Sequence, residues 1–238
     1  MTERNQDEIR AEAKIAKPEI PRITGAYRQR SVMVPEEIYK ASGIVINGRR
    51  IKSMIFTTDI AIIRNCNADA VLAVYPFTPQ QVISHTIITA ASIPVFCGIG
   101  GGLTGGMRSA LIAKDAEAQG AFGVVVNAPF AIEAIRTIKQ MIDIPIISTV
   151  VKEDTDLDAA IDAGVSIFNI SAADKTADLV RKVRQRYPTF PIIATGGPTP
   201  ETILKTIDAG ANGISYTPPS TAELFGEIME KYRKEEGM

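Results

Sequence analysis

The residue types best suited to chemistry in this chain stand at the ends of short apolar segments. Asp59, Asn127 and Asn169 are the first candidates for catalytic residues. The two asparagines could orient a carbonyl group or a water molecule without a change in charge. Asp59 could serve as a general base or as one ligand of Mg²⁺, or it could simply cap the helix that follows. No cofactor is assigned from these residues: a metal-independent site and one assisted by Mg²⁺ through Asp59 both stay open.

Lys152 and Cys97 are candidate nucleophiles, and for both a structural interpretation is favoured. Lys152 could form a Schiff base if burial lowered its pKa, so it is included among the candidate catalytic residues. Three acidic residues follow closely, however, and negative charge raises the pKa of a lysine (Glu153, Asp154, Asp156). A surface lysine before an acidic helix start is therefore favoured. Cys97 precedes a glycine-rich loop, but most free cysteines are buried and inert.

The single histidine, His85, limits the hydrolytic chemistry that is available. Zinc sites of the His-x-His or HExxH type need two histidines, and a Ser-His-Asp triad would have to use His85. This residue lies in an apolar segment with helical spacing, where a histidine on the helix face is favoured. Classical serine and zinc hydrolase chemistry is thereby nearly excluded.

A glycine-rich loop lies between an apolar segment and a predicted helix. Six of the nine residues from Gly98 to Gly106 are glycine. Successive free amides leading into a helix start can bind an anion, which makes Gly100, Gly101 and Gly102 candidate substrate-binding residues. A flexible lid, or glycines needed for close packing, would give the same pattern.

A second glycine pair follows the apolar segment 191–195. In (β/α)₈ barrels phosphate commonly binds in the loop after the seventh strand, which here would contain Thr195, Gly196 and Gly197. The next helix is predicted to begin at Pro200. Further on, Pro218 and Pro219 have no N–H to donate, so Ser220 and Thr221 are the candidates that could cap the last helix and offer its amides.

Short β-branched segments alternate with helical ones from residue 53 onward. This alternation predicts βαβ units around a parallel sheet, and the number of strands favours a closed (β/α)₈ barrel, or TIM barrel, of the α/β class. A recurring pattern of two strands and two helices supports the same fold. The predicted strands are 53–57, 70–74, 94–98, 124–127, 145–151, 167–171, 191–195 and 213–217. Helices are predicted over segments that include 107–120, 130–142, 177–187 and 199–210.

Side-chain alternation places several polar residues on one face of these strands. If alternate strands are aligned on the helix-ending glycines at 120, 164 and 210, Asn169 and Ser215 occupy matching positions. The residues that fall on the same face two positions later are Asn127, Ser171 and Thr217. Such a face fits a polar barrel mouth, although a buried structural network would look the same.

The first 52 residues stand outside the repeat and are assigned to a separate region, residues 1–52, before a barrel over 53–238. Residues 2–16 are polar with a helical pattern, and Asn47-Gly48 between apolar alternations predicts a β-hairpin. The hairpin could plug the amino-terminal end of the barrel, while the arm could cross to a neighbouring subunit. A homo-oligomer formed through this arm is therefore expected.

Composition narrows the partners and the compartment. The 26 basic and 27 acidic residues nearly cancel, so no broad positive field is available to bind nucleic acid. The amino terminus has no apolar signal-peptide core, and no apolar run is long enough to cross a membrane. With only two cysteines, a disulfide scaffold is not expected. We expect a cytoplasmic protein that binds a small-molecule substrate, with neither a nucleic-acid nor a membrane partner.

Two resemblances support the predicted fold. The segments 194–197 and 208–215 resemble the phosphate-binding, aldolase-type TIM barrels, which include thiamine-phosphate synthase and the keto-deoxy-phosphogluconate aldolases. Segments 21–25, 45–48, 57–59, 97–102 and 217–220 are similar to a bacterial family of small TIM barrels that carries only the description "hydrolase". That resemblance implies the barrel and a hydrolase description, but no particular substrate.

These observations predict an enzyme acting on a small, phosphorylated or carboxylated metabolite. Lyase or isomerase chemistry suits a histidine-poor barrel better than classical hydrolysis does, whereas the family resemblance points to a hydrolase. The alternative is a barrel without catalytic activity that senses a phosphorylated metabolite and regulates a partner. A flavin-binding barrel is a third hypothesis.

Overall fold

The computed structural model describes residues 21, 23 and 32–235. The chain divides into two units, Met1–Ser31 and Val32–Met238, and every element described below belongs to the second. The polar helix predicted over residues 2–16 lies outside the described residues, as does most of the arm. Homo-oligomer formation through the arm therefore stays a prediction.

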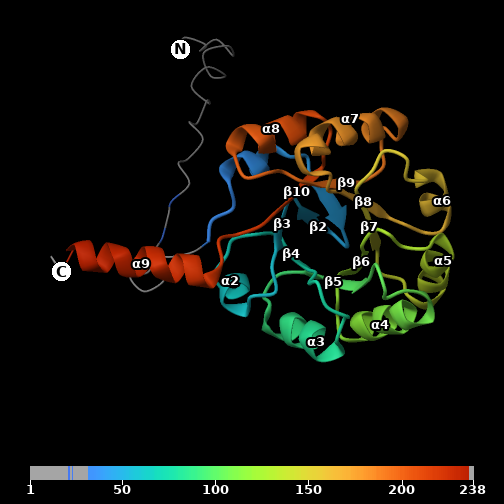
Figure 1. The fold of residues 1–238 in the computed structure, drawn as a ribbon, viewed down its shortest axis with the longest axis horizontal. Helices are drawn as coiled ribbons and strands as arrows, with labels where there is room; N and C mark the ends of the chain where they lie inside the picture. Colours follow the sequence, from blue (N-terminus) through green and yellow to red (C-terminus); the bar gives the residue numbers. More distant parts are fainter. Residues whose placement is uncertain (1–20, 22, 24–31, 236–238) are drawn as a thin grey trace, which may run out of the picture. The chain divides into compact units, whose positions relative to one another are not determined.

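Within residues 32–235, eight parallel strands form a closed barrel, which confirms the predicted (β/α)₈ fold (Figure 1). The strands follow one another around the ring in chain order, and β10 pairs with β3 to close it. No strand boundary differs from its predicted position by more than two residues. The strands are β3 (Ser53–Phe56), β4 (Ala70–Ala73), β5 (Val95–Gly100), β6 (Gly123–Val126), β7 (Ile146–Val150), β8 (Ile167–Ile170), β9 (Ile192–Thr195) and β10 (Gly213–Tyr216).

A helix follows each strand of the barrel. The helices that precede β6, β8 and β10 are each followed by a glycine with positive φ, at 94° for Gly120, 109° for Gly164 and 112° for Gly210. No helix in residues 32–235 is long and apolar enough to cross a lipid bilayer. The α-helices are α2 (Ile60–Arg64), α3 (Gln81–Ala90), α4 (Gly106–Ala118), α5 (Ile132–Met141), α6 (Leu157–Asp162), α7 (Thr176–Arg186), α8 (Pro200–Asp208) and α9 (Thr221–Glu235). The short 3₁₀ helices in the described part of the chain are η1 (Glu36–Lys40) and η2 (Ala173–Lys175).

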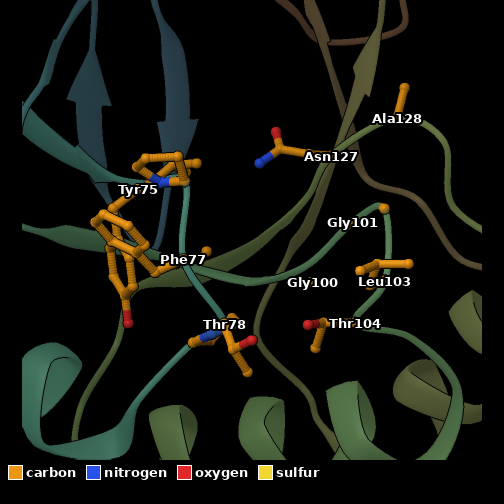
Figure 2. A pocket seen from close by; sticks show the side chains of 14 residues that line it. Tyr75, Phe77, Thr78, Gly100, Gly101, Leu103, Thr104, Asn127 and Ala128 are labelled. Carbon is orange, nitrogen blue, oxygen red and sulfur yellow. The ribbon is translucent and has the colours of Figure 1, made fainter.

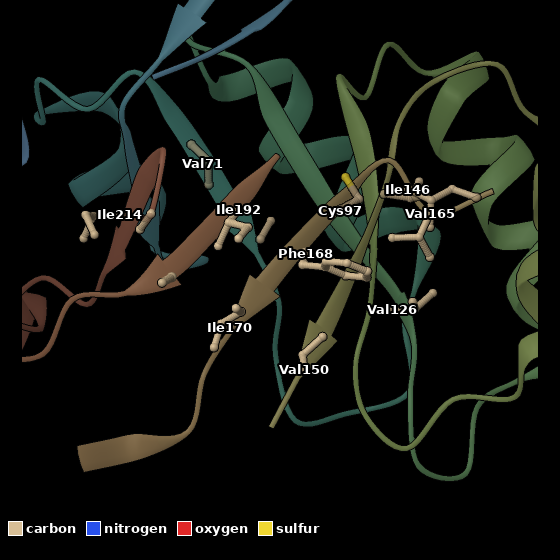
Figure 3. Close-up of a cluster of buried hydrophobic side chains, with 14 of the residues drawn as sticks. Val71, Cys97, Val126, Ile146, Val150, Val165, Phe168, Ile170, Ile192 and Ile214 are labelled. Atoms are coloured by element: carbon tan, nitrogen blue, oxygen red, sulfur yellow. The ribbon is translucent and has the colours of Figure 1, made fainter. Parts of the chain in front are cut away.

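The strands separate two apolar clusters because successive side chains point to opposite faces. The outer cluster lies between the barrel wall and the helices, and it includes Val126, Ile170 and Ile214 (Figure 3). The inner cluster fills the barrel with larger side chains such as Met54 and Phe96. Its other barrel members are Ala70, Leu72, Val125, Ile147, Ile167 and Ile193.

The predicted hairpin closes the amino-terminal end of the barrel. Strands β1 (Ile44–Ile46) and β2 (Arg49–Ile51) are antiparallel, and Asn47 and Gly48 between them both have positive φ. The apolar face of the hairpin belongs to the inner cluster, through Ile44, Ile46 and Ile51. The plug is thus confirmed, and the hairpin forms one compact unit with the barrel.

Arg184 donates hydrogen bonds to two chain segments, one just before β9 and one just before β10. Its Nε donates to the carbonyl oxygen of Gly210 at 3.0 Å, and its Nη1 donates to that of Phe190 at 2.8 Å. Its Nη2 also donates to Asn212 Oδ1 at 2.6 Å. The planar guanidinium suits this fork, and a lysine could not make the same set of bonds.

We expect Arg184→Met to lower the free energy of unfolding by about 2–3 kcal/mol, because several acceptors would lose a charged donor. Arg181→Met is the matched control, since Arg181 makes an exposed pair with Asp178 at 3.0 Å. Such a pair contributes less than about 1 kcal/mol. Urea unfolding of the two variants measures the difference, and equal losses would contradict the role given to Arg184.

Candidate active site at the mouth of the barrel

Above the apolar filling, the barrel interior becomes polar at the carboxyl ends of the strands. A cavity of about 290 Å³ lies there, in the position where barrels of this fold form their active sites. The predicted face is confirmed, because neighbouring residues such as Val126, Ile170 and Tyr216 pack in the outer cluster instead. The polar residues that line the cavity are Asn127, Thr149, Asn169, Ser171, Thr195, Ser215 and Thr217.

Thr149 joins the two predicted asparagines. Its hydroxyl donates to Asn127 Oδ1 at 2.9 Å and accepts from Asn169 Nδ2 at 3.4 Å. Asn169 is only 6% exposed, and its buried Oδ1 accepts no hydrogen bond from any described residue. A buried acceptor without a partner costs about 1–3 kcal/mol, so this atom points to a ligand or a water molecule.

Hydroxyl groups cover the opposite side of the cavity. Thr195 Oγ1 donates to Ser171 Oγ at 3.2 Å and lies 3.4 Å from Ser215 Oγ. Because a hydroxyl can both donate and accept, this group adapts its polarity to a ligand. The sequence placed Ser171 and Ser215 on this face without selecting them as binding residues. Their strand-end position was the signal that could have selected them.

A second cavity, of about 370 Å³, adjoins the first and shares Val74 and Asn127 with it. Tyr75 and Phe77 lie on one side of this cavity, and the glycine-rich loop lies across from them (Figure 2). Sequence reasoning did not select the two aromatic residues, although Tyr75 directly follows a predicted strand. Phe77 is 71% exposed, which is a signal that only the structure supplies.

The glycine loop packs closely against Asn127. A Cβ atom at Gly101 would lie 2.8 Å from both Cβ and the carbonyl oxygen of Asn127, and φ at Gly101 is +144°. The carbonyl oxygen of Gly100 accepts from Asn127 N at 3.0 Å. The close-packing interpretation is therefore supported at Gly100 and Gly101, whereas a Cβ at Gly102 would meet no atom within 4 Å.

The amides of this loop are partly used within the protein. Gly101 N donates to the carbonyl oxygen of Thr104 at 2.9 Å, and Gly102 N donates to that of Pro129 at 3.3 Å. An anion bound by these two amides would have to break both bonds. Gly100, Gly101 and Gly102 do line the second cavity, so contact with a substrate stays a prediction.

Acidic side chains occupy the helix starts at which phosphate binding is predicted. Ser220 donates to the Glu223 carboxylate from both its backbone N–H and its hydroxyl, at 2.7 Å each. The hydrogen bond from the backbone N–H is the main reason that the pKa of Glu223 lies below its usual value. At the start of α8, the backbone N–H of Glu201 and the Thr199 side chain lower the pKa of Glu201. Phosphate there would meet like charge.

The predicted phosphate-site residues divide between two environments. Thr195 lines the mouth cavity. Gly196 and Gly197 do not line it, and each meets a neighbouring side chain so closely that a Cβ would clash, at 2.7 Å and 2.6 Å. Ser220 caps α9 through its bonds with Glu223. Thr221, the first residue of α9, is exposed and bonded to Asp59.

Asp59 caps α2 and does not line either cavity at the barrel mouth. Its Oδ1 accepts from the amides of Ala61 and Ile62 at 2.8 and 3.2 Å, and its Oδ2 accepts from the Thr221 hydroxyl. This last bond is the main reason that the pKa of Asp59 lies below its usual value. The helix-cap alternative is confirmed, and both oxygens are already engaged.

None of the remaining candidates lines either of the two cavities described above. Lys152 is exposed, so it lacks the burial that a Schiff-base lysine requires, and it lines a third cavity that shares Thr149 with the first. His85 lies on the exposed face of α3. Cys97 is 1% exposed, and burial raises its pKa to about 11, which agrees with the buried, inert interpretation.

The donor set at the mouth does not fit Mg²⁺. This ion prefers carboxylate oxygens, whereas the cavity oxygens among residues 32–235 belong to amides and hydroxyls. No cluster of three or more His, Cys, Asp or Glu residues in that part of the chain could hold a metal. Both carboxylate oxygens of Asp59, the predicted ligand, already accept hydrogen bonds from the start of α2 and from Thr221.

No family model and no curated protein matches this chain. The similarity to the family described as "hydrolase" therefore stays a prediction. The fold and the site together define a (β/α)₈ barrel with a neutral, ligand-sized cavity at the carboxyl ends of its strands.

Solved structures share this fold at low sequence identity. One is phosphonopyruvate hydrolase in complex with oxalate and Mg²⁺, with 14% identity, a TM-score of 0.58 and coverage of 81% of this chain and 85% of that one. Another is 2,3-dimethylmalate lyase, a PEP mutase/isocitrate lyase superfamily member, with 14% identity, a TM-score of 0.59 and coverage of 85% and 86%. Phosphoenolpyruvate phosphomutase from Streptomyces platensis subsp. rosaceus has 15% identity, a TM-score of 0.58 and coverage of 84% of each chain.

We expect Gly101→Ala to lower the free energy of unfolding by about 1–3 kcal/mol and to displace Asn127, because the new Cβ meets that residue at an unfavourable φ. Gly105→Ala is the matched control in the same loop. Its φ is −156° and no atom lies within 4 Å of the position that its methyl group would take, so the change should stay within about 0.5 kcal/mol. Thermal unfolding measures the loss of stability in each of the two variants. Equal stabilities would contradict the close-packing role.

Proposed function

We propose that this chain is an enzyme that acts on a small carboxylated or phosphorylated metabolite in the cavity at the barrel mouth. The observation that carries the proposal is the layer of polar side chains that converges there above an apolar filling. A cavity with a few converging polar groups at the carboxyl ends of barrel strands is the expected place for an active site.

The names of the structural neighbours support the substrate class. Phosphonopyruvate, phosphoenolpyruvate and dimethylmalate are small acids, and the corresponding proteins are described as a hydrolase, a phosphomutase and a lyase. Because one fold hosts many reactions, they support a range of reactions rather than one. Lyase, isomerase and hydrolase chemistry all remain within the proposal.

Asn127 is the residue best placed to stabilise developing charge. Its Oδ1 accepts from Thr149, its Nδ2 donates to no described residue, and the residue lines both cavities. A fixed amide N–H aimed at an enolate or oxyanion is a common way to lower a reaction barrier. Asn169 and Thr149 keep the Asn127 amide in one orientation.

The lining also supports a second candidate function. Among residues 32–235, the buried Tyr216, which packs in the outer cluster, is the only ionisable residue that lines the 290 Å³ mouth cavity. General acid–base catalysis by a carboxylate, lysine or histidine is therefore not provided by these residues. A barrel that binds a metabolite and regulates a partner would need none of them.

Asn127→Ala distinguishes the two functions. Carboxylated and phosphorylated metabolites would first be screened by thermal unfolding, since a ligand at 100 times its Kd adds about 2.7 kcal/mol of stability. Compounds that bind would then be tested for turnover. For the enzyme, we expect Asn127→Ala to reduce kcat by about 10²–10³-fold while Kd rises much less.

Asn65→Ala is the matched control, because Asn65 is an exposed residue that ends α2 and should leave turnover unchanged. Binding without turnover would support the sensing barrel. Turnover that Asn127→Ala leaves unchanged would contradict the proposed active site.

A further inference from the structure

The hydrogen bonds around Thr149 give the inner part of the cavity a defined polarity. The single hydroxyl proton goes to Asn127 Oδ1 at 2.9 Å, and the hydroxyl oxygen accepts from Asn169 Nδ2 at 3.4 Å. This leaves Asn127 Nδ2 as a free donor and Asn169 Oδ1 as a free acceptor among the described residues. If the relay ran in the other direction, the two asparagines would exchange roles, and one donor and one acceptor would still remain.

Charge is disfavoured at this position. A carboxylate of the ligand would meet the acceptor oxygen of Asn169, and an ammonium group would meet the donor of Asn127. The nearby hydroxyl groups of Ser171, Thr195 and Ser215 carry no compensating charge. Because a buried charge without a partner of opposite sign is costly, the ligand group that fits here is uncharged.

The adjoining cavity favours a flat shape. Tyr75 and Phe77 lie on one side, and the loop across from them presents backbone without side chains at Gly100 and Gly101 (Figure 2). Aromatic rings bind planar groups by stacking or edge contacts. A planar group between these two sides can reach Asn127, which borders both cavities.

We propose that the deep part of the site recognises a planar, uncharged group that carries a hydrogen-bond donor next to an acceptor, as a cyclic amide does. Its carbonyl oxygen accepts from Asn127 Nδ2, and its N–H donates to Asn169 Oδ1. The inference rests on the proposed function in placing the ligand in the mouth cavity. It adds that any carboxylate or phosphate of that ligand stays outside the pair of asparagines.

Three small probes test this chemistry with the full-length protein. The first is 2-pyridone, a planar cyclic amide; the second is N-methyl-2-pyridone, which has lost the N–H; the third is benzoate, which is planar but negatively charged. Titration calorimetry, with saturation-transfer NMR for weak binders, gives the three values of Kd. We expect 2-pyridone to bind about tenfold or more tightly than the other two. N-methyl-2-pyridone would leave the buried Asn169 Oδ1 without a donor, and benzoate would place an anion against it.

Two nearly isosteric variants connect the preference to the proposed residues. Asn169→Leu should raise the Kd for 2-pyridone about tenfold and bring it close to the Kd for N-methyl-2-pyridone. Thr149→Val should raise the Kd for 2-pyridone, because it removes the hydrogen bonds that hold the side-chain amides of Asn127 and Asn169. It provides an independent test should Asn169→Leu fail to fold. Thr137→Val is the matched control, since Thr137 bonds only to Glu133 on the exposed face of α5.

Equal Kd values for 2-pyridone and its N-methyl derivative, or tighter binding of benzoate, would overturn the inference. An unchanged preference in folded Thr149→Val and Asn169→Leu would do the same. The two proposals fail separately. If 2-pyridone binds through Asn169 but no acidic metabolite is turned over, the inference stands and the enzyme proposal falls. If an acidic metabolite is turned over while benzoate displaces 2-pyridone, the enzyme proposal stands and the inference falls.

Discussion

Closure of the barrel is the constraint on which the rest of this structure depends. Once β10 pairs with β3, the interior is narrow enough that side chains must fill it. Large apolar residues such as Met54 and Phe96 fill its middle, and the hairpin covers the amino-terminal end. Short polar side chains at the opposite end leave room for a ligand. The cavity is therefore a consequence of the short polar side chains at the ends of β6 to β10, while Phe56 and Val74 form its apolar side.

The glycine-rich loop shows how packing and function can use the same residues. Gly101 allows the loop to approach Asn127 more closely than any other residue would permit, and Gly100 allows the same close approach to Ser109 and Thr104. This approach fixes one side of the Asn127 backbone, while Thr149 holds its side chain. The same loop presents bare backbone to Tyr75 and Phe77, which shapes the adjoining cavity (Figure 2). An anion site is not needed to explain why these positions are glycine.

Charge is arranged around the cavity rather than within it. Asp59, Glu201 and Glu223 each stabilise a helix start, and hydrogen bonds from helix-start groups lower the pKa of all three. These carboxylates satisfy the amides that a phosphate group would otherwise use. The interior among residues 32–235 is left with amides and hydroxyls. This arrangement favours recognition of a ligand by hydrogen-bond polarity over recognition by charge. It is compatible with an enzyme and with a sensing barrel.

The sequence by itself determined the barrel, because strand and helix patterns and the helix-ending glycines are local signals. It also determined which face of each strand carries the polar residues, since side chains alternate strictly. Only the tertiary structure decided how these residues pair. The bond from Thr221 to Asp59 spans 162 positions, and the bond from Thr149 to Asn127 crosses between neighbouring strands. The contact of Gly101 with Asn127 likewise joins separate loops. Such pairings depend on strand register and barrel closure, which no local pattern contains.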